Sequence, residues 1–187
     1  MNDEFSSPMA LPLVLHAVVF ATEKHRGQVR KDADSTPYIQ HPIALASLLW
    51  EVGIHDAEVL AAAILHDTIE DTDATPDEIE REFGADVRRL VLEMTDDMSL
   101  PSPQRKQKQV DRAATLSSRA KLIKIADKIA NVGDIARHPP PDWTDERRRN
   151  YFNWTKQVID RVRGTNAALE SCYDEALRQA REILGDH

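Results

Sequence analysis

The sequence feature that most constrains the fold is an unbroken apolar run from Val59 to Leu65. Asp56 precedes the run and is a good N-cap residue, so the pattern predicts a helix that begins there. Because this helix would be apolar on every side, we expect it to be buried at the centre of other helices. The run is far shorter than the roughly 20 residues of a membrane span, and no membrane association is expected.

The rest of the chain also has a helical pattern. Strand signals are scarce, since there are only 6 glycines and no Asn-Gly or Asp-Gly hairpin. Residues 27–41 are polar and predict a loop, at most with a short hairpin. Pro42 suits the first position of a helix that ends at Gly53. Further helices are expected after the N-cap residues Thr75 and Thr144, over 118–137 and over 166–184, with Gly164 closing the helix that follows Thr144.

Length and composition fit one soluble domain. The chain has 187 residues, 41% of them hydrophobic and 30% charged, which is typical of a globular protein. We expect a single all-α domain over residues 1–187, with a functional core at about 17–166. Cys172 is the only cysteine, so no intrachain disulfide can form. The N-terminus lacks the basic start of a signal peptide, and a cytoplasmic location is expected.

The net charge of −8 disfavours nucleic acid as a partner. An anionic substrate would need a local basic patch that overcomes this charge. Basic residues gather in a few segments, although solvated helix faces would look the same; they are Arg26, Arg30, Lys31, Arg105, Lys106, Lys108, Lys121, Lys124, Lys128 and Arg147.

A His-Asp pair, His66-Asp67, closes the apolar run. Buried polar groups are costly unless something satisfies them, and a metal ion would do so. Helix capping is the simpler alternative for the dipeptide alone. Glu70 and Asp71 follow the two residues at a spacing of four, so on a continuing helix each acid lies one turn beyond a possible ligand. A solvated acidic turn is the alternative for these acids.

Two more candidate ligands lie elsewhere in the chain. His41 precedes Pro42 at an expected helix start, and Asp127 lies within the expected helix over 118–137. Two imidazoles and two carboxylates, with no thiolate, suit Mn²⁺, Fe²⁺ or a similar ion better than structural zinc. Such an ion would leave positions for water and a substrate oxygen, and Glu70 and Asp71 could move protons.

Several stretches, in this order, resemble the HD hydrolase domain of the RelA/SpoT family, and above all its short stand-alone members. They are AVVFATEKHRGQVRKDADSTPYIQHP, AAAILHDTIEDTDATPDEIEREFGADVRRLV, MTDDMSLPSPQRKQKQV, RAKLIKIADKIAN, and YFNW followed by RGTN. The resemblance implies Mn²⁺-dependent removal of the 3′-pyrophosphate of (p)ppGpp, giving GDP or GTP. It implies a small nucleotide as the partner and no synthetase activity in this chain.

The same resemblance implies a role for each matching residue. One divalent ion per chain would be held by His41, His66, Asp67 and Asp127, and Glu70 and Asp71 would form the catalytic acidic pair. The implied substrate contacts are Arg30, Lys31, Asn131, Arg147 and Tyr151.

The sequence departs from the family pattern at three positions. Ala130 stands where an aromatic residue or histidine is usual, and Gly133 and Ser102 stand where basic residues are usual or frequent. The metal site is unaffected by them, but the exact nucleotide stays open. The alternatives are another HD phosphatase activity, such as removal of the 2′-phosphate of NADPH, and a non-catalytic nucleotide-binding module. The second would be marked by loss of a ligand or of the acidic pair, and neither is lost.

Overall fold

The computed structural model describes residues 10–186, which divide into two compact units. The described part of unit 1 is residues 10–28 and 38–98, and that of unit 2 is residues 29–37 and 99–186. Within residues 10–186 there is no strand. The segment predicted as a loop with at most a short hairpin contains one isolated antiparallel bridge, between Val29 and Pro37. The all-α prediction is confirmed, and the single-domain span stays a prediction.

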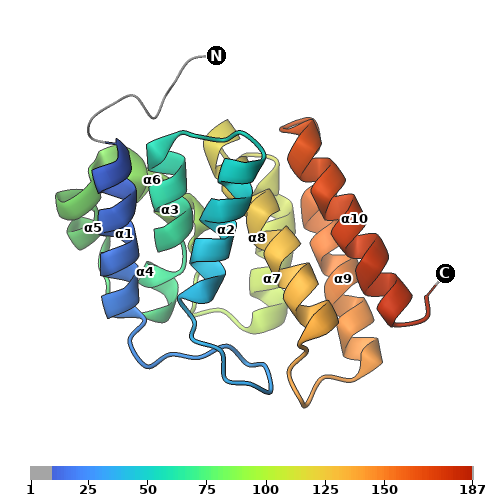
Figure 1. The fold of residues 1–187 in the computed structure, drawn as a ribbon. Helices are drawn as coiled ribbons and strands as arrows, with labels where there is room; N and C mark the ends of the chain where they lie inside the picture. The colour runs from blue at the N-terminus through green and yellow to red at the C-terminus, as the bar shows by residue number, and fades with distance from the viewer. Residues whose placement is uncertain (1–9, 187) are drawn as a thin grey trace. The chain divides into compact units, whose positions relative to one another are not determined.

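Unit 1 is built around helix α3 (Figure 1). Its helices are α1 (Ala10–Lys24), α2 (Gln40–Glu51), α3 (Ala57–Leu65), α4 (Thr68–Asp71), α5 (Pro76–Phe83) and α6 (Ala85–Met94). Helix α3 packs against α1, α2 and α6, and α5 packs against α6. Every residue from Val59 to Leu65 is buried. The apolar run therefore forms the central helix of this unit, as predicted.

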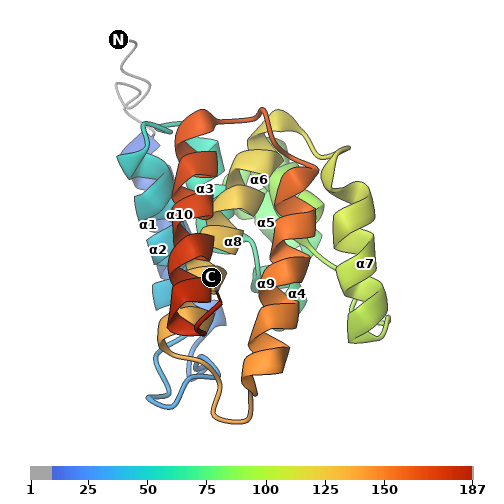
Figure 2. The same ribbon diagram turned by 90° about the vertical axis from the view of Figure 1, so that its right-hand side faces the viewer.

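Unit 2 is arranged around α8 and α9 (Figure 2). Its helices are α7 (Ser102–Ala113), α8 (Ser118–Arg137), α9 (Asp145–Asp160) and α10 (Ala167–Ile183). Helix α8 packs against α9 and α10, while α7 contacts α9. The predicted ligand Asp127 is thus a buried residue of the helix at the centre of this unit.

Most helix ends lie where the capping residues predict them. Asp56 accepts hydrogen bonds from the backbone N–H groups of Glu58 and Val59, and Thr75 and Thr144 cap α5 and α9. Two predicted boundaries were wrong. Helix α2 begins at Gln40, so Pro42 is its third residue, which is tolerated because the first N–H groups of a helix have no intrahelical acceptor. Helix α9 ends at Asp160, before a turn in which Gly164 has φ 85°.

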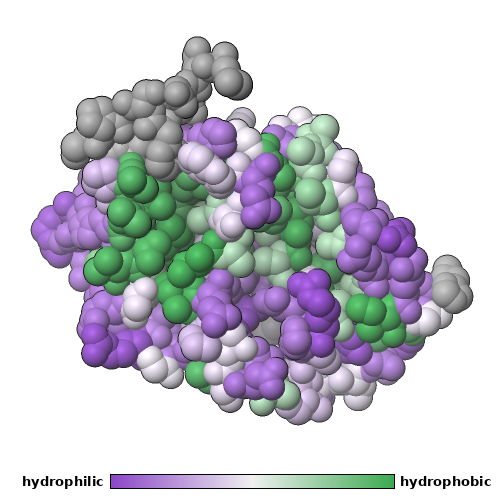
Figure 3. All heavy atoms as spheres, viewed as in Figure 1, coloured by the Kyte–Doolittle hydropathy of each residue, from purple (hydrophilic) through white to green (hydrophobic). Residues whose placement is uncertain are grey.

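Helix α1 presents a second apolar face to solvent. Leu11, Leu15 and Val19 are 53%, 54% and 67% exposed, at a spacing of four residues, and a hydrophobic patch covers this helix in Figure 3. The opposite face buries Ala17 and Ala21. None of the described helices is long and apolar enough to cross a membrane. The cytoplasmic location stays a prediction.

Candidate metal centre

The His66-Asp67 pair forms the turn that joins α3 to α4. Helix α3 ends at Leu65, both residues keep right-handed helical backbone angles, and α4 follows at once. The backbone N–H of Asp71 donates to the carbonyl of Asp67 at 2.9 Å. The regular helix is thus interrupted at the pair, but the helical backbone angles persist, so the acids of α4 follow their partners by about one turn.

The imidazole of His66 is oriented by the end of α3. Its Nδ1 lies 2.8 Å from the carbonyl oxygen of Ala63, which only accepts hydrogen bonds, so Nδ1 carries the proton. In the neutral ring, Nε2 then presents a lone pair. This atom lies 3.0 Å from Oδ2 of Asp67.

Two electron-pair donors at this separation suit a shared cation. Perpendicular ligands of an octahedral ion with bonds of about 2.1 Å lie roughly 3.0 Å apart. A metal-binding histidine also commonly donates its other N–H to a backbone carbonyl, as His66 does to Ala63. The residues present in unit 1 therefore fit a divalent metal ion.

His41 lies next to this pair. It belongs to the first turn of α2, is only 4% exposed, and its ring centroid lies 5.4 Å from that of His66. Unit 1 therefore brings together three of the four predicted ligands: both imidazoles and the carboxylate of Asp67.

Tyr38 joins Asp67 to Asp71. Its phenol donates to the carboxylate of Asp67 and lies 3.2 Å from Oδ2 of Asp71. Its ring is stacked on the buried His25 at a centroid distance of 4.7 Å. Sequence reasoning did not select Tyr38, although its position three residues before His41 was a usable signal.

The acids of α4 have pKa values above their ordinary range. Burial is the main cause for Glu70, with the negative charge of Asp67 adding to it, although the N–H of Asp96 donates to its Oε2 at 2.9 Å. The pKa of Asp71 is raised first by partial enclosure of its carboxyl group, although the residue as a whole is exposed, and then by Asp67. Carboxyl groups with raised pKa values are better proton acceptors near neutral pH.

A second layer of side chains supports Asp71. Nδ1 of His25 is 2.7 Å from Oε1 of Gln28, and Nε2 of Gln28 donates to the carbonyl of Asp71 at 2.8 Å. Sequence reasoning missed both residues because the contact joins positions that are far apart in the chain.

In unit 2, the predicted ligand Asp127 belongs to a buried polar network. It is 6% exposed, its Oδ2 is 2.9 Å from Nζ of Lys128, and its Oδ1 accepts from Asn131. Arg30 donates to Asn131 and forms a 2.8 Å ion pair with Asp134. Two predicted substrate residues, Arg30 and Asn131, therefore share one network with Asp127. Asp127 is thus buried in unit 2, as His41 and His66 are in unit 1, and a buried carboxylate of this kind can serve as a metal ligand.

The other predicted substrate residues are more exposed. Arg147 is exposed and pairs with Asp142 at 3.2 Å, and its guanidinium lies 4.5 Å from the ring centre of Trp143. Tyr151 is half-buried and its ring contacts Trp143 and Trp154. Lys31 is exposed. Their roles stay predictions.

One departure from the family pattern has a local compensation. Gly133 is buried on α8, and a Cβ placed there would lie 2.8 Å from Nη2 of Arg137. The guanidinium of Arg137 therefore covers the surface that the glycine leaves open. A positive charge from the next turn of the helix therefore lies beside position 133.

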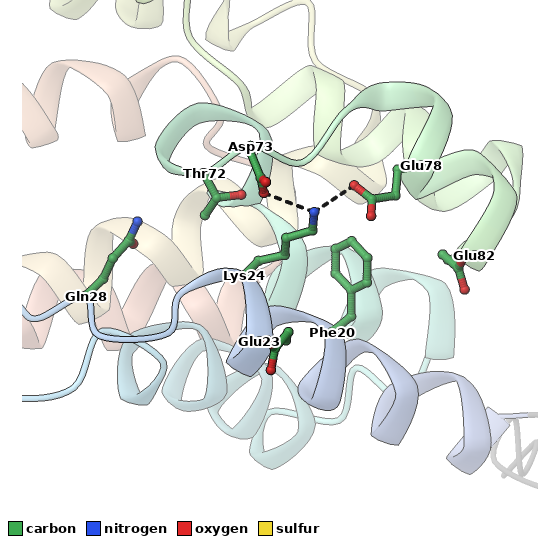
Figure 4. Close-up of a pocket in the computed structure, with 8 residues that line it drawn as sticks. All are labelled: Phe20, Glu23, Lys24, Gln28, Thr72, Asp73, Glu78 and Glu82. Atoms are coloured by element: carbon green, nitrogen blue, oxygen red, sulfur yellow. Dashed lines mark hydrogen bonds and ion pairs between the residues drawn. The ribbon is translucent and has the colours of Figure 1, made fainter.

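A cavity of about 720 Å³ in unit 1 is lined by other residues (Figure 4). Lys24 reaches into it between Asp73 and Glu78, at 3.0 and 2.9 Å, and Glu23 and Glu82 also line it. None of the predicted site residues is among them. Acidic walls repel phosphates, so this cavity does not suit an anionic nucleotide.

Comparison with known proteins matches residues 17–153 to the HD domain. The chain belongs to the HD-domain family. It is 51% identical to guanosine-3′,5′-bis(diphosphate) 3′-pyrophosphohydrolase MESH1 of Mus musculus, over 92% of this chain and 94% of that protein. It is 36% identical to guanosine-3′,5′-bis(diphosphate) 3′-pyrophosphohydrolase of Haemophilus influenzae, over 70% of this chain but 19% of that longer protein.

The HD fold is also seen in a solved structure. A structure described as a metazoan ortholog of SpoT that hydrolyzes ppGpp superimposes with a TM-score of 0.86 and 49% sequence identity, over 89% of this chain and 94% of that one. The family resemblance inferred from the sequence motifs is thereby confirmed.

Proposed function

We propose that this HD domain hydrolyses the 3′-pyrophosphate of (p)ppGpp. The single observation that carries the proposal is the arrangement of His66, Asp67 and the acids of α4. The hydrogen bond at Nδ1 of His66 leaves its Nε2 facing Asp67. One turn further along the chain, Glu70 and Asp71 have raised pKa values. The named activity of relatives near 50% identity supports the same chemistry.

Four residues are proposed to hold one divalent ion: His41, His66, Asp67 and Asp127. Their mixed nitrogen and oxygen donors favour Mn²⁺, with Fe²⁺ as an alternative. When bound, the ion supplies positive charge that stabilises phosphate oxygens and acidifies water. Asp127 is proposed as the ligand from unit 2 on the strength of its burial and its family position.

The side chains of unit 1 divide the proton chemistry between them. Water attacks the phosphorus bonded to the 3′-oxygen, that P–O bond breaks, and GDP or GTP leaves with pyrophosphate as the second product. Glu70, held in place by the N–H of Asp96, accepts the proton of the attacking water. Asp71, whose pKa is also raised, gives a proton to the departing 3′-oxygen. Tyr38 orients Asp67 and Asp71 through its phenol.

Five residues are proposed to contact the nucleotide: Arg30, Lys31, Asn131, Arg147 and Tyr151. The best-supported are Arg30 and Asn131, because their hydrogen-bond network includes Asp127. Arginine and asparagine offer several donors to phosphate and base oxygens.

The deciding experiment is a substrate panel with purified protein and Mn²⁺, comparing ppGpp, pppGpp and NADPH. The proposal expects pyrophosphate release and the highest kcat/KM with a guanosine 3′-pyrophosphate. If kcat/KM were higher for removal of the NADPH 2′-phosphate, NADPH would be the assigned substrate instead. If no substrate were turned over with any divalent metal, the proposed function would be rejected. In parallel, Asp67→Ala should lose bound metal and activity together.

A further inference from the structure

Unit 2 contains a row in which cations and aromatic rings alternate. Nζ of Lys128 lies 4.6 Å from the ring centre of Trp154. Nζ of Lys106 lies 5.0 Å from the same ring and 5.3 Å from that of Tyr151. The row continues through the contact of Tyr151 with Trp143, whose ring lies 4.5 Å from the guanidinium of Arg147.

The outer cations of this row have anionic partners. Lys128 pairs with Asp127 at 2.9 Å, and Arg147 pairs with Asp142 at 3.2 Å. Lys106 lies between them and forms no ion pair with any carboxylate in the described part of the chain. Positive charge is thus concentrated at Lys106 without local neutralisation.

The protein holds Lys106 in place despite this cost. The indole N–H of Trp154 donates to the carbonyl oxygen of Lys106 at 3.0 Å, which ties α9 to α7. The side chain is half-buried, and its pKa is lowered first by burial and then by the positive charges of Arg147 and Lys128. Cation–π contacts recover only about 0.5–2 kcal/mol each. An anion beside the ammonium group would relieve the remaining repulsion.

We propose that Lys106 binds a phosphate group of the nucleotide, with Tyr151 and Trp154 fixing its ammonium group. This deepens the proposed hydrolase function and rests on it for the identity of the substrate. Lys128 is paired with Asp127 and Arg147 with Asp142, so Lys106 is the cation of the row whose charge no carboxylate of the described residues offsets. The phosphate belongs either to the 3′-pyrophosphate that leaves or to the 5′-phosphates that remain.

The test compares Lys106→Gln with Lys156→Gln, which removes the same charge from an ion pair with Asp160 on α9. Calorimetric titration of the metal-free proteins with pyrophosphate gives a readout that needs no turnover. A hydrogen bond between charged groups contributes enough to weaken pyrophosphate binding by about 10–100-fold in Lys106→Gln. Lys156→Gln should bind like the parent protein.

Lys106→Arg separates a binding role from a structural one. It keeps a cation over both rings, so it should recover pyrophosphate affinity to within about threefold. A fall in affinity that Arg does not restore, or a fall equal in Lys156→Gln, would reject the proposal. So would pyrophosphate affinity that is unchanged in Lys106→Gln.

Steady-state kinetics then distinguish the two phosphates. Lys106→Gln should raise KM for ppGpp. If the same rise occurs with guanosine 3′-diphosphate, which has no 5′-phosphate, the contact is to the leaving pyrophosphate; if it disappears, the contact is to the 5′ group. Should ppGpp not be a substrate at all, the pyrophosphate titration still decides the role of Lys106.

Discussion

The phenol of Tyr38 donates a hydrogen bond to the carboxylate of Asp67. It thereby neutralises part of the charge on a predicted ligand and fixes the rotamer of that carboxylate. The same phenol reaches Asp71, so one side chain positions both a ligand and a proton-transfer group. Residues that support a ligand in this way are typically worth 10–100-fold in metal affinity or activity.

Tyr38→Phe should therefore weaken Mn²⁺ binding or lower kcat by about 10–100-fold while the fold is retained. Metal titration and kinetics on the purified variant measure both quantities. Tyr173→Phe is the matched control, because it also removes a hydrogen-bonded phenol, here a buried one that contacts Thr155 in unit 2. The control should lose only about 1 kcal/mol of stability. If the two variants had equal metal affinity and equal kcat, the assignment would be contradicted.

Glu70→Gln should separate proton transfer from metal binding. The amide keeps an acceptor for the N–H of Asp96 but loses basicity. We expect kcat to fall by about 10²–10⁴-fold, with metal content near that of the parent. Metal analysis of the same sample is the check: loss of the ion would make Glu70 a ligand, and full activity would remove it from the mechanism. Glu80→Gln, on α5, is the control and should be neutral.

Asp71→Asn should raise the Tm of the metal-free protein at neutral pH. A carboxyl group with a raised folded pKa binds protons more tightly in the folded state, so it destabilises the metal-free fold as pH rises through that pKa. The destabilisation is absent below the unfolded pKa of about 3.9. Each kcal/mol recovered corresponds to about 2–4 °C for a chain of this size.

The measurement for Asp71→Asn is thermal unfolding in chelator across the pH range. The gain in Tm should shrink as pH falls and vanish in strong acid. Asp77→Asn removes an exposed carboxylate from the first turn of α5 and should give no gain. A gain of equal size at every pH would show that the charge of Asp71 is not its cause.

Gly133→Ala should stabilise the protein by about 0.5–1 kcal/mol, because alanine restricts the unfolded chain and favours the helix. The three atoms nearest the new Cβ all belong to the flexible end of Arg137, which can move aside. Gly164→Ala is the opposing control, since φ of 85° strains any residue with a side chain. Urea unfolding of both variants measures the change in the free energy of unfolding. If this change had the same sign in both variants, the local geometry described here would be contradicted.

Local features of the fold were predictable from the sequence. The capping by Asp56 and the apolar run after it determine α3 without help from distant residues, and the spacing of Glu70 and Asp71 follows from the helix that continues past it. Pro42 was misplaced because proline is tolerated at several positions of a first helical turn.

Contacts between distant segments were not predictable in this way. The hydrogen bond from Gln28 to Asp71, and that from Trp154 to Lys106, depend on how separate helices pack. Nothing in the spacing of these residues indicates a partner. The structure was therefore needed to select Tyr38 and to distinguish Lys106 from the other basic residues, whereas residue type and spacing already indicated the candidate ligands.

The carbonyl oxygen of Ala63 that orients His66 is a main-chain group at the end of α3. Any amino acid at position 63 would provide the same acceptor. Substitutions at this position are therefore limited only by packing, and they leave the hydrogen bond that orients the imidazole in place. The hydrogen bond that Asp67 accepts from Tyr38 comes from a side chain instead, so a single codon change from tyrosine to phenylalanine removes it. Over long evolutionary times we therefore expect the histidine half of the pair to be the robust one, and the aspartate half to depend on selection at a second position.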